Sequence, residues 1–260
     1  MTPTITSADN PQFKLARKLA QSGRERRKTG LTLLDGMHLI MAWQESGRDL
    51  QKILANATFA ENPAFKAWLA AHPAVPVVLF SPNLYAEIAG DDFPSGVLAL
   101  VETPAASGGM NLQADCVVLD GVQDPGNLGT LLRSAAAAGV PQAVLSAECA
   151  QAWGPKALRA GMGAHFALHI YEGVHLPDFL SAYSGTVAVT DLAGAVSLYE
   201  AALNSPLAWV FGSEGEGVSA AVRACATLRV KIPMPGKVES LNVSAAAAIC
   251  LFESVRQRNR

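Results

Sequence analysis

The chain has 260 residues, half of them hydrophobic, and a formal net charge of −2. This length allows one large domain or two ordinary domains, each with a buried core. No apolar run approaches the ~20 residues that span a bilayer, and residues 1–20 lack the apolar segment of a secretory signal. The four cysteines are scattered, which argues against a zinc site and a disulfide framework. We therefore expect a cytoplasmic protein in a reducing compartment, with no membrane and no metal.

The charge is unevenly distributed along the chain. Residues 1–28 carry only two acidic side chains, and their seven basic side chains are Lys14, Arg17, Lys18, Arg24, Arg26, Arg27 and Lys28. A basic segment on an acidic remainder is typical of a protein that touches a phosphate-rich partner at one end. A solvated basic helix without any partner has the same composition, so charge alone leaves both interpretations open.

The first hundred residues alternate between helix-forming and short apolar segments, which predicts a small α/β domain. Helices are expected at residues 11–28, 37–47 and 82–89, and strands at residues 31–34, 50–55, 76–80 and 96–101. The small and turn-prone residues from Thr103 to Gly109 are typical of a linker. We therefore expect a domain at residues 1–105, a linker at 106–113 and a second domain at 114–260.

The second part of the chain contains short and continuously apolar segments. Strands are expected at residues 116–119, 143–145, 167–170, 187–189, 208–211 and 228–232, and helices at 127–139 and 244–256. Unbroken apolar strands are typical of a parallel sheet that is covered on both faces. The second domain is therefore predicted to be a parallel-sheet α/β domain.

The first segment that can carry chemistry runs from Leu119 to Arg133, through a strand, a Pro-Gly turn and the start of a helix. Ligands of open α/β sheets bind outside the carboxyl ends of the strands, so Asn127 is expected near a site. Helix capping alone would also explain Asn127. Arg133 lies in an apolar helical stretch, where an arginine must be paired, face a cleft or lie on the surface.

The second segment, from Phe211 to Gly217, follows a strand directly and contains three glycines that allow close approach of a ligand. Glu214 and Glu216 would repel a phosphate, so a neutral or cationic ligand fits better. A flexible acidic turn is the alternative.

The third segment runs from Val230 to Ser244, and its Ser240 and Asn242 alternate with apolar residues before a helix. These polar groups can line a pocket or cap the helix.

Other chemistries find little support. The five histidines are dispersed, and the His165–His169 spacing lacks the glutamate of a zinc-protease helix. The chain has neither the glycine-rich fingerprint of dinucleotide-binding domains nor the lysine of a phosphate-binding loop. A nucleotide-binding α/β enzyme of another type is therefore disfavoured.

Taken together, the three segments resemble, in order and spacing, the three motifs of the SpoU (TrmH-type) class of SPOUT RNA methyltransferases. The resemblance covers roughly residues 116–253. The N-terminal part also resembles the substrate-binding domain of that class, through Ile5-Thr-Ser7, Asn10-Pro11, Arg26-Arg-Lys28 and Asp35-Gly36. In the class, the position of Asp35 is more often a glutamate.

This resemblance implies a ribosomal-protein-like RNA-binding domain, a catalytic SPOUT domain with a trefoil knot, and a homodimer. It implies S-adenosylmethionine as the methyl donor and a ribose 2′-hydroxyl as the acceptor, in ribosomal RNA more than in transfer RNA. The positions that it assigns to catalysis are Arg133, Asn127, Glu214, Ser240 and Asn242. Those that it assigns to the cofactor are Thr190, Gly212, Ile232 and Leu241. RNA binding is expected from Lys14, Arg17, Arg26, Arg27 and Lys28.

Methyl transfer requires the ribose oxygen in line with the methyl carbon and control of a weakly acidic proton. A guanidinium has a pKa above ~12 and rarely loses a proton. The expected role of Arg133 is therefore to hold a neighbouring phosphate and to stabilise negative charge on the oxygen. Asn127 and Glu214 would orient Arg133 or the nucleotide. The competing hypothesis is a non-catalytic RNA-binding or ribosome-assembly factor with the same fold.

Overall fold

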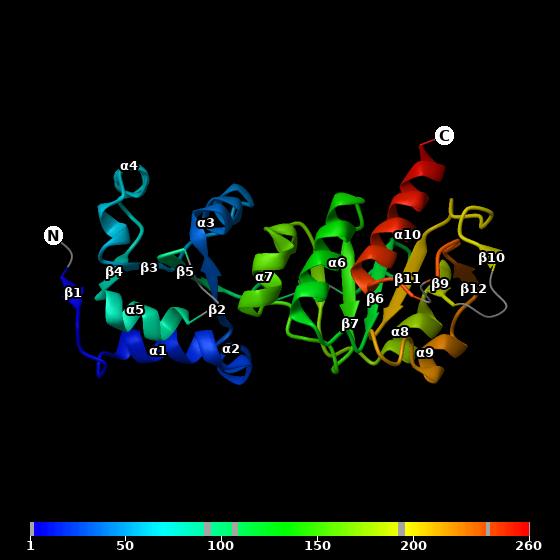
Figure 1. Ribbon diagram of the computed structural model, residues 1–260, viewed down its shortest axis with the longest axis horizontal. Helices are drawn as coiled ribbons and strands as arrows, with labels where there is room; N and C mark the ends of the chain where they lie inside the picture. Colours follow the sequence, from blue (N-terminus) through cyan, green and yellow to red (C-terminus); the bar gives the residue numbers. More distant parts are fainter. Residues whose placement is uncertain (1–2, 91–94, 106–108, 192–195, 238–239, 260) are drawn as a thin grey trace. The chain divides into compact units, whose positions relative to one another are not determined.

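The computed structural model describes residues 3–90, 95–105, 109–191, 196–237 and 240–259. The chain forms two compact units (Figure 1). The first unit contains residues 1–105 together with Trp153–Phe166, and the second contains Ala106–Ala152 together with Ala167–Arg260. Part of the expected linker, residues 106–108, lies outside the described residues. The end of that segment belongs to the second unit, where Asn111 and Gln142 exchange two hydrogen bonds.

The second unit is built on a seven-stranded sheet with the order β10-β12-β9-β11-β6-β7-β8, in which every pairing is parallel. The strands are β6 (Cys116–Asp120), β7 (Gln142–Leu145), β8 (His169–Tyr171), β9 (Thr186–Thr190), β10 (Val196–Ser197), β11 (Leu207–Gly212) and β12 (Leu228–Lys231). The central strands β6 and β11 pair over five residues and are buried along their length apart from Asp120. The prediction of a parallel sheet covered on both faces is confirmed.

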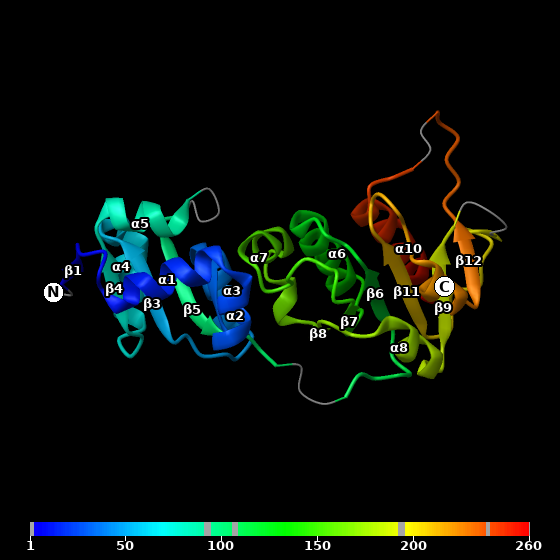
Figure 2. The same ribbon diagram turned by 90° about the horizontal axis from the view of Figure 1, so that it is seen from below.

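Helices cover both faces of this sheet (Figures 1 and 2). They are α6 (Pro125–Ala137), α8 (Leu176–Ala182), α9 (Ala220–Ala224) and α10 (Val243–Arg258). Cys116 and Val118 pack with the apolar side chains of α8 and α9. Because side chains alternate along a strand, the neighbouring positions face α6 and α10, as the hydrogen bond from the indole of Trp209 to Ser254 of α10 shows.

The first unit contains a mixed sheet with the order β1-β4-β3-β5-β2. Its strands are β1 (Thr4–Ile5), β2 (Leu31–Asp35), β3 (Lys52–Asn56), β4 (Val77–Phe80) and β5 (Val97–Glu102). Its helices are α1 (Pro11–Gln21), α2 (Gly23–Thr29), α3 (Gly36–Glu45), α4 (Pro63–Ala71), α5 (Pro82–Ala89) and α7 (Pro155–Gly161), with two short 3-10 turns at Phe59–Glu61 and Ala164–Phe166. The apolar sides of α1 and α5 form one core with β2 to β5.

The return of residues 153–166 to the first unit has a visible chemical basis. The hydroxyl of Thr32 donates to the carbonyl of Trp153 at 2.7 Å. The guanidinium of Arg48 donates to the carbonyl of Phe166 at 3.1 Å, and the ring of Phe166 packs edge-on against Trp43. The domains expected from the sequence, 1–105 and 114–260, are continuous, so they place residues 153–166 in the second domain and do not include this return.

No helix in the described part of the chain combines the length and hydrophobicity that crossing a membrane requires.

The basic N-terminal segment forms two helices, so the prediction of one helix over residues 11–28 is wrong. Ser22 leaves the helical conformation at φ −125° and ψ 109°, and its hydroxyl caps α2 by accepting from the backbone N–H of Glu25. A serine followed by glycine stops one helix and starts the next, because the hydroxyl satisfies a backbone donor that has no partner within the helix.

Arg26 differs from the other basic residues of this segment. It is only 9% exposed, and its guanidinium donates to the carbonyls of Leu19 (2.5 Å) and Ala20 (3.2 Å) in the last turn of α1. The neighbouring Arg27 and Lys28 are exposed. The structure therefore gives Arg26 a structural role in joining α1 to α2, and its guanidinium is engaged inside the unit.

We expect Arg26→Ala to lower the free energy of unfolding by about 2 kcal/mol, because it removes charged hydrogen bonds and leaves two carbonyls without their donor. Arg27→Ala is the matched control and should change the free energy by less than about 0.5 kcal/mol. Urea denaturation of the full chain measures both. Equal effects of the two substitutions would contradict the structural role of Arg26.

Candidate active site

Three segments that are far apart in the sequence meet at the side chain of Asn127. The amide nitrogen of Asn127 donates to a carboxylate oxygen of Glu214 at 2.5 Å, and the amide oxygen of Asn127 accepts from the amide nitrogen of Asn242 at 2.8 Å. Asn127 lies in the first turn of α6, Glu214 in the loop after β11, and Asn242 immediately before α10. The structure thus brings together one polar residue from each of the three sequence motifs.

The side chain of Asn242 fixes the direction of these hydrogen bonds. The side-chain oxygen of Asn242 accepts from the backbone N–H and the hydroxyl of Ser244 at the start of α10. The amide nitrogen of Asn242 is therefore the group that points to Asn127, which leaves the nitrogen of Asn127 to donate to Glu214. A carboxylate oxygen accepts hydrogen bonds, so this chain of bonds ends at Glu214. Asn242 is both a helix cap and a member of the network.

Asn127 does not cap its helix, so the capping explanation of this residue is wrong. Asp124 is the N-cap of α6, and its carboxylate accepts from the backbone N–H of Asn127 at 2.7 Å. Because Asp124 satisfies that backbone donor, the side chain of Asn127 is available for the network. An acidic residue before a Pro-Gly pair and a helix was the sequence signal for this cap.

Arg133 lies six residues after Asn127 on α6 and is exposed. No hydrogen bond or ion pair joins its guanidinium to another residue in the part of the chain that the structure describes. Its position on the surface agrees with the surface alternative of the sequence analysis. A guanidinium that has no protein partner can bind an external phosphate through several donors.

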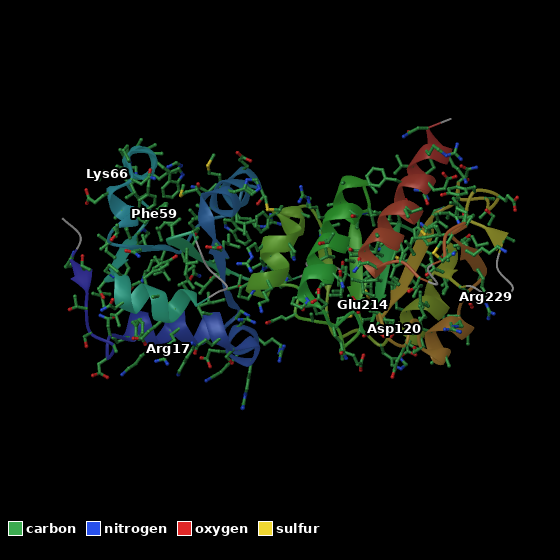
Figure 3. All side chains as sticks on the ribbon, viewed as in Figure 1. Arg17, Phe59, Lys66, Asp120, Glu214 and Arg229 are labelled. Atoms are coloured by element: carbon green, nitrogen blue, oxygen red, sulfur yellow. The ribbon has the colours of Figure 1, made fainter. Side chains whose placement is uncertain are left out.

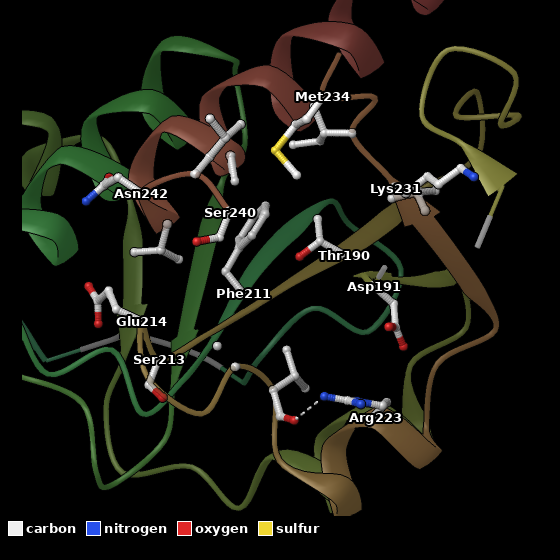
Figure 4. Close-up of a pocket in the computed structure, with 18 residues that line it drawn as sticks. Thr190, Asp191, Phe211, Ser213, Glu214, Arg223, Lys231, Met234, Ser240 and Asn242 are labelled. Atoms are coloured by element: carbon white, nitrogen blue, oxygen red, sulfur yellow. Dashed lines mark hydrogen bonds between the residues drawn. The ribbon is translucent and has the colours of Figure 1, made fainter. Parts of the chain in front are cut away.

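A cavity of about 520 Å³ lies beside the network (Figure 4). Seven of the nine residues assigned to catalysis or to the cofactor line it: Thr190, Gly212, Glu214, Ile232, Ser240, Leu241 and Asn242. Asn127 borders it only through its bonds to Glu214 and Asn242, and Arg133 is not among the lining residues. The wall also contains Phe211 and Met234, which are apolar, and Asp191 and Arg223, which are charged. Sequence reasoning did not single out these four residues.

The backbone packed around position 212 leaves room only for a glycine. A Cβ atom at this position would lie 2.1 Å from the carbonyl carbon of Gly217 and 2.3 Å from the nitrogen of Val218. The close approach arises because Ser213 and Gly217 exchange two backbone hydrogen bonds, which fold the loop back on the end of β11. The loop that carries Glu214 is therefore held in place by a contact that only glycine permits.

A second cavity, of about 820 Å³, shares the Ser213–Gly217 loop with the first. Its lining includes the acidic residues Asp120, Glu148, Glu214 and Glu216. The carboxylate of Asp120, at the end of β6, accepts from the backbone N–H of Ser219 at 2.8 Å. Figure 3 labels Asp120 and Glu214, which lie near one another at this end of the sheet. Within the described residues, no group of three or more metal-ligating side chains is arranged to hold a metal ion.

Comparison with known proteins identifies the class. The family model of the SpoU rRNA methylases matches residues 115–252, and that of the MRM3-like substrate-binding domain matches residues 10–99. An uncharacterized tRNA/rRNA methyltransferase of Synechocystis is 35% identical over 98% of this chain and 94% of its own length. The 23S rRNA (guanosine(2553)-2′-O)-methyltransferase RlmP of Bacillus subtilis is 30% identical over 95% of this chain and 97% of its own length.

Solved structures agree with this result. The SpoU methyltransferase AviRb from Streptomyces viridochromogenes, crystallised with the cofactor AdoMet, superposes with a TM-score of 0.85 at 27% identity and covers 96% of this chain and 98% of its own. An AdoMet-bound rRNA methyltransferase from Sinorhizobium meliloti superposes with a TM-score of 0.81 at 28% identity, over 98% of both chains. This chain belongs to the SpoU rRNA methylase family.

We expect Gly212→Ala to destabilise the second unit by at least ~2 kcal/mol, because the new methyl group overlaps backbone atoms that cannot move without opening the loop. The matched control is Gly215→Ala in the same loop, where a Cβ meets nothing within 4 Å. Urea denaturation of both variants makes the comparison. A Gly212→Ala protein as stable as the Gly215→Ala protein would contradict the tight loop.

Proposed function

We propose that this protein transfers the methyl group of S-adenosylmethionine to a ribose 2′-hydroxyl of ribosomal RNA. The observation that carries the proposal is the Asn242–Asn127–Glu214 network at the edge of the 520 Å³ cavity. It unites the three sequence motifs of the family in one place. The family membership and the AdoMet-bound structural relatives support the same activity.

The cavity suits this cofactor in size and chemistry. Its volume falls in the range of about 300–1,000 Å³ that small-molecule sites occupy. Phe211, Ile232, Met234 and Leu241 provide apolar surface for a flat base, while charged and hydroxyl groups line the remainder.

Ribosomal RNA is favoured as the substrate by the extent of the similarity. The B. subtilis relative, named as an enzyme of 23S rRNA, matches both units of this chain. Two structural neighbours, one described by 2-OH methylation of C/U34 on tRNA and one described as a tRNA modifying enzyme, cover only 59% and 57% of it. The MRM3-like domain at residues 10–99 is thus shared with rRNA-modifying relatives. Transfer RNA remains the second candidate, because the Synechocystis relative is named for both RNAs.

S-adenosylmethionine, when bound, supplies an electrophilic methyl group on a sulfonium. Arg133 holds the phosphate beside the target ribose and stabilises the charge that develops on the 2′-oxygen. Glu214 is oriented by Asn127, and its negative charge at the cavity wall is compatible with a cationic sulfonium. Asn242 holds the loop before α10 by capping that helix, and Ser240 lines the cavity, where it can contact the incoming nucleotide. Each residue thereby positions a reactant, which is the main requirement of an in-line transfer.

RNA attraction is assigned to four of the exposed cations of α1 and α2, namely Lys14, Arg17, Arg27 and Lys28. Arg17 is labelled on α1 in Figure 3. Lys14 is paired with Asp9 at 2.9 Å, and Arg17 lies 3.6 Å from Glu87, but all four partners are largely exposed, so phosphates can displace them at small cost. Arg26 is not assigned to RNA binding, because its side chain is buried. RNA affinity that does not fall with rising salt would contradict this surface.

Three further expectations belong to the proposal. The trefoil knot follows from the family fold. A homodimer follows from the family resemblance, and Phe252 on α10, which is 48% exposed, is a candidate contact. Analytical ultracentrifugation of the full chain tests it. A cytoplasmic location follows from an rRNA substrate.

The test uses the purified chain, methyl-labelled S-adenosylmethionine and unmodified ribosomal RNA or subunits. We expect label at one alkali-resistant linkage, and we expect Arg133→Ala to reduce the transfer rate by about 100-fold or more, because it removes charge stabilisation in the transition state. Arg229→Ala, an exposed arginine on β12 (Figure 3), is the matched control.

Full turnover by Arg133→Ala with normal RNA binding would contradict the assignment of Arg133. Label on transfer RNA alone would show that transfer RNA, and not ribosomal RNA, is the substrate. No label on any RNA, together with no cofactor binding, would favour the assembly-factor alternative.

A further inference from the structure

Arg223 is a charged residue in the wall of the 520 Å³ cavity that the proposed transfer does not use. It lies on α9, and one terminal nitrogen of its guanidinium donates to the carbonyl of Val218 at 3.1 Å. Its Nε atom is shielded from solvent and has no hydrogen-bond partner in the described part of the chain. A buried donor without a partner is costly, so the contacts of the described chain do not by themselves account for the placement of this guanidinium.

The surroundings of Arg223 define which kind of group it can take. Asp191, at the end of β9, also lines the cavity, and in Figure 4 its carboxylate points toward the Arg223 side. Lys231 lines the same cavity, but Figure 4 shows its ammonium directed outward. Arg223 is therefore the cation at the floor of the cavity, with an anionic side chain beside it. One positive and one negative group at the same end suit a zwitterion.

The two ends of the cavity carry different polar side chains. Glu214 and Asn242 lie on one side of the Phe211 ring in Figure 4, and Arg223 and Asp191 lie on the other. The first pair belongs to the network that joins the three motifs. Arg223 is anchored separately from that network, since its side chain donates to the loop carbonyl of Val218.

We propose that Arg223 binds the carboxylate of the amino-acid end of S-adenosylmethionine, and that Asp191 faces its ammonium group. The inference rests on the proposed function, because it names a contact of the same cofactor. The carboxylate is the one anionic group of that molecule, and a guanidinium binds carboxylates through two parallel hydrogen bonds. The anchoring bond from Arg223 to Val218 holds the guanidinium in position before the ligand arrives, which reduces the entropy lost on binding.

Two ligands separate this contact from all others in the cavity. S-adenosylhomocysteine carries the amino-acid end, whereas 5′-methylthioadenosine has the same base, ribose and sulfur but lacks that end. Calorimetric titration of the full chain with each ligand therefore isolates the contribution of the carboxylate and ammonium. The variants are Arg223→Gln, which removes the charge, and Arg223→Lys, which keeps it but loses the two-pronged geometry. Arg229→Gln on the exposed side of β12 is the matched control.

We expect Arg223→Gln to weaken S-adenosylhomocysteine binding by about tenfold or more, as for loss of a charged hydrogen bond, and to leave 5′-methylthioadenosine binding within about threefold. Arg223→Lys should fall between Arg223→Gln and the unmodified chain, and Arg229→Gln should match the unmodified chain.

An equal loss for both ligands would show that Arg223 supports the loop or the nucleoside, and would overturn the inference while the proposed function stands. Unchanged S-adenosylhomocysteine affinity would overturn it in the same way. An unmodified chain that binds neither ligand would overturn the proposed cofactor, and this assignment with it.

Discussion

The site depends on one constraint, which is the side chain of Asn127 held between a donor and an acceptor. Asn242 is fixed by its role as the cap of α10, so it presents its amide nitrogen to Asn127, and Asn127 must then present its own nitrogen to Glu214. Because each group has only one chemically sensible orientation, the start of α6, the loop after β11 and the start of α10 are placed relative to one another. The packing of α6 against α10 on one face of the sheet supports the same arrangement.

The sheet explains why these three segments can meet. β6 and β11 are hydrogen-bonded neighbours and both are parallel, so the start of α6 and the Glu214 loop leave the sheet at the same edge. Gly212 then lets the loop fold back within van der Waals distance of its own strand. The polar network, the tight loop and the two cavities are therefore consequences of one local geometry at the carboxyl ends of the central strands, where ligands of open α/β sheets bind.

Much of this could be predicted from the sequence. The unbroken apolar runs of the second unit specified buried parallel strands, and turn residues directly after a strand indicated where polar side chains gather. The break at Ser22 was missed, because the flanking helix formers outweigh one capping serine in a pattern argument. The return of residues 153–166 was also missed, since it depends on long-range contacts of Thr32 and Arg48 that no local period encodes.

The candidate site likewise combines residues that the sequence selected with residues that only the fold brings together. Spacing and family resemblance selected Asn127, Glu214 and Asn242, but they could not distinguish capping from catalysis at Asn127. The structure excludes capping, because Asp124 occupies the cap, and the catalytic role of Asn127 stays a prediction. Arg223 and Asp191 carried no motif, and only the fold brings α9 and the end of β9 to one cavity. Arg26 shows the opposite case, in which composition indicated a surface charge and tertiary structure buried it.

The most direct test of the account is methyl transfer by Asn127→Asp, measured across pH together with S-adenosylhomocysteine affinity. This change leaves an acceptor for Asn242 but replaces the donor to Glu214 with a second carboxylate, and two carboxylates in contact cannot both be ionised without cost. The account predicts cofactor affinity within about threefold of the unmodified chain and transfer reduced by ~100-fold at pH 8, with partial recovery as acid supplies the shared proton. Unchanged transfer at pH 8 would contradict it.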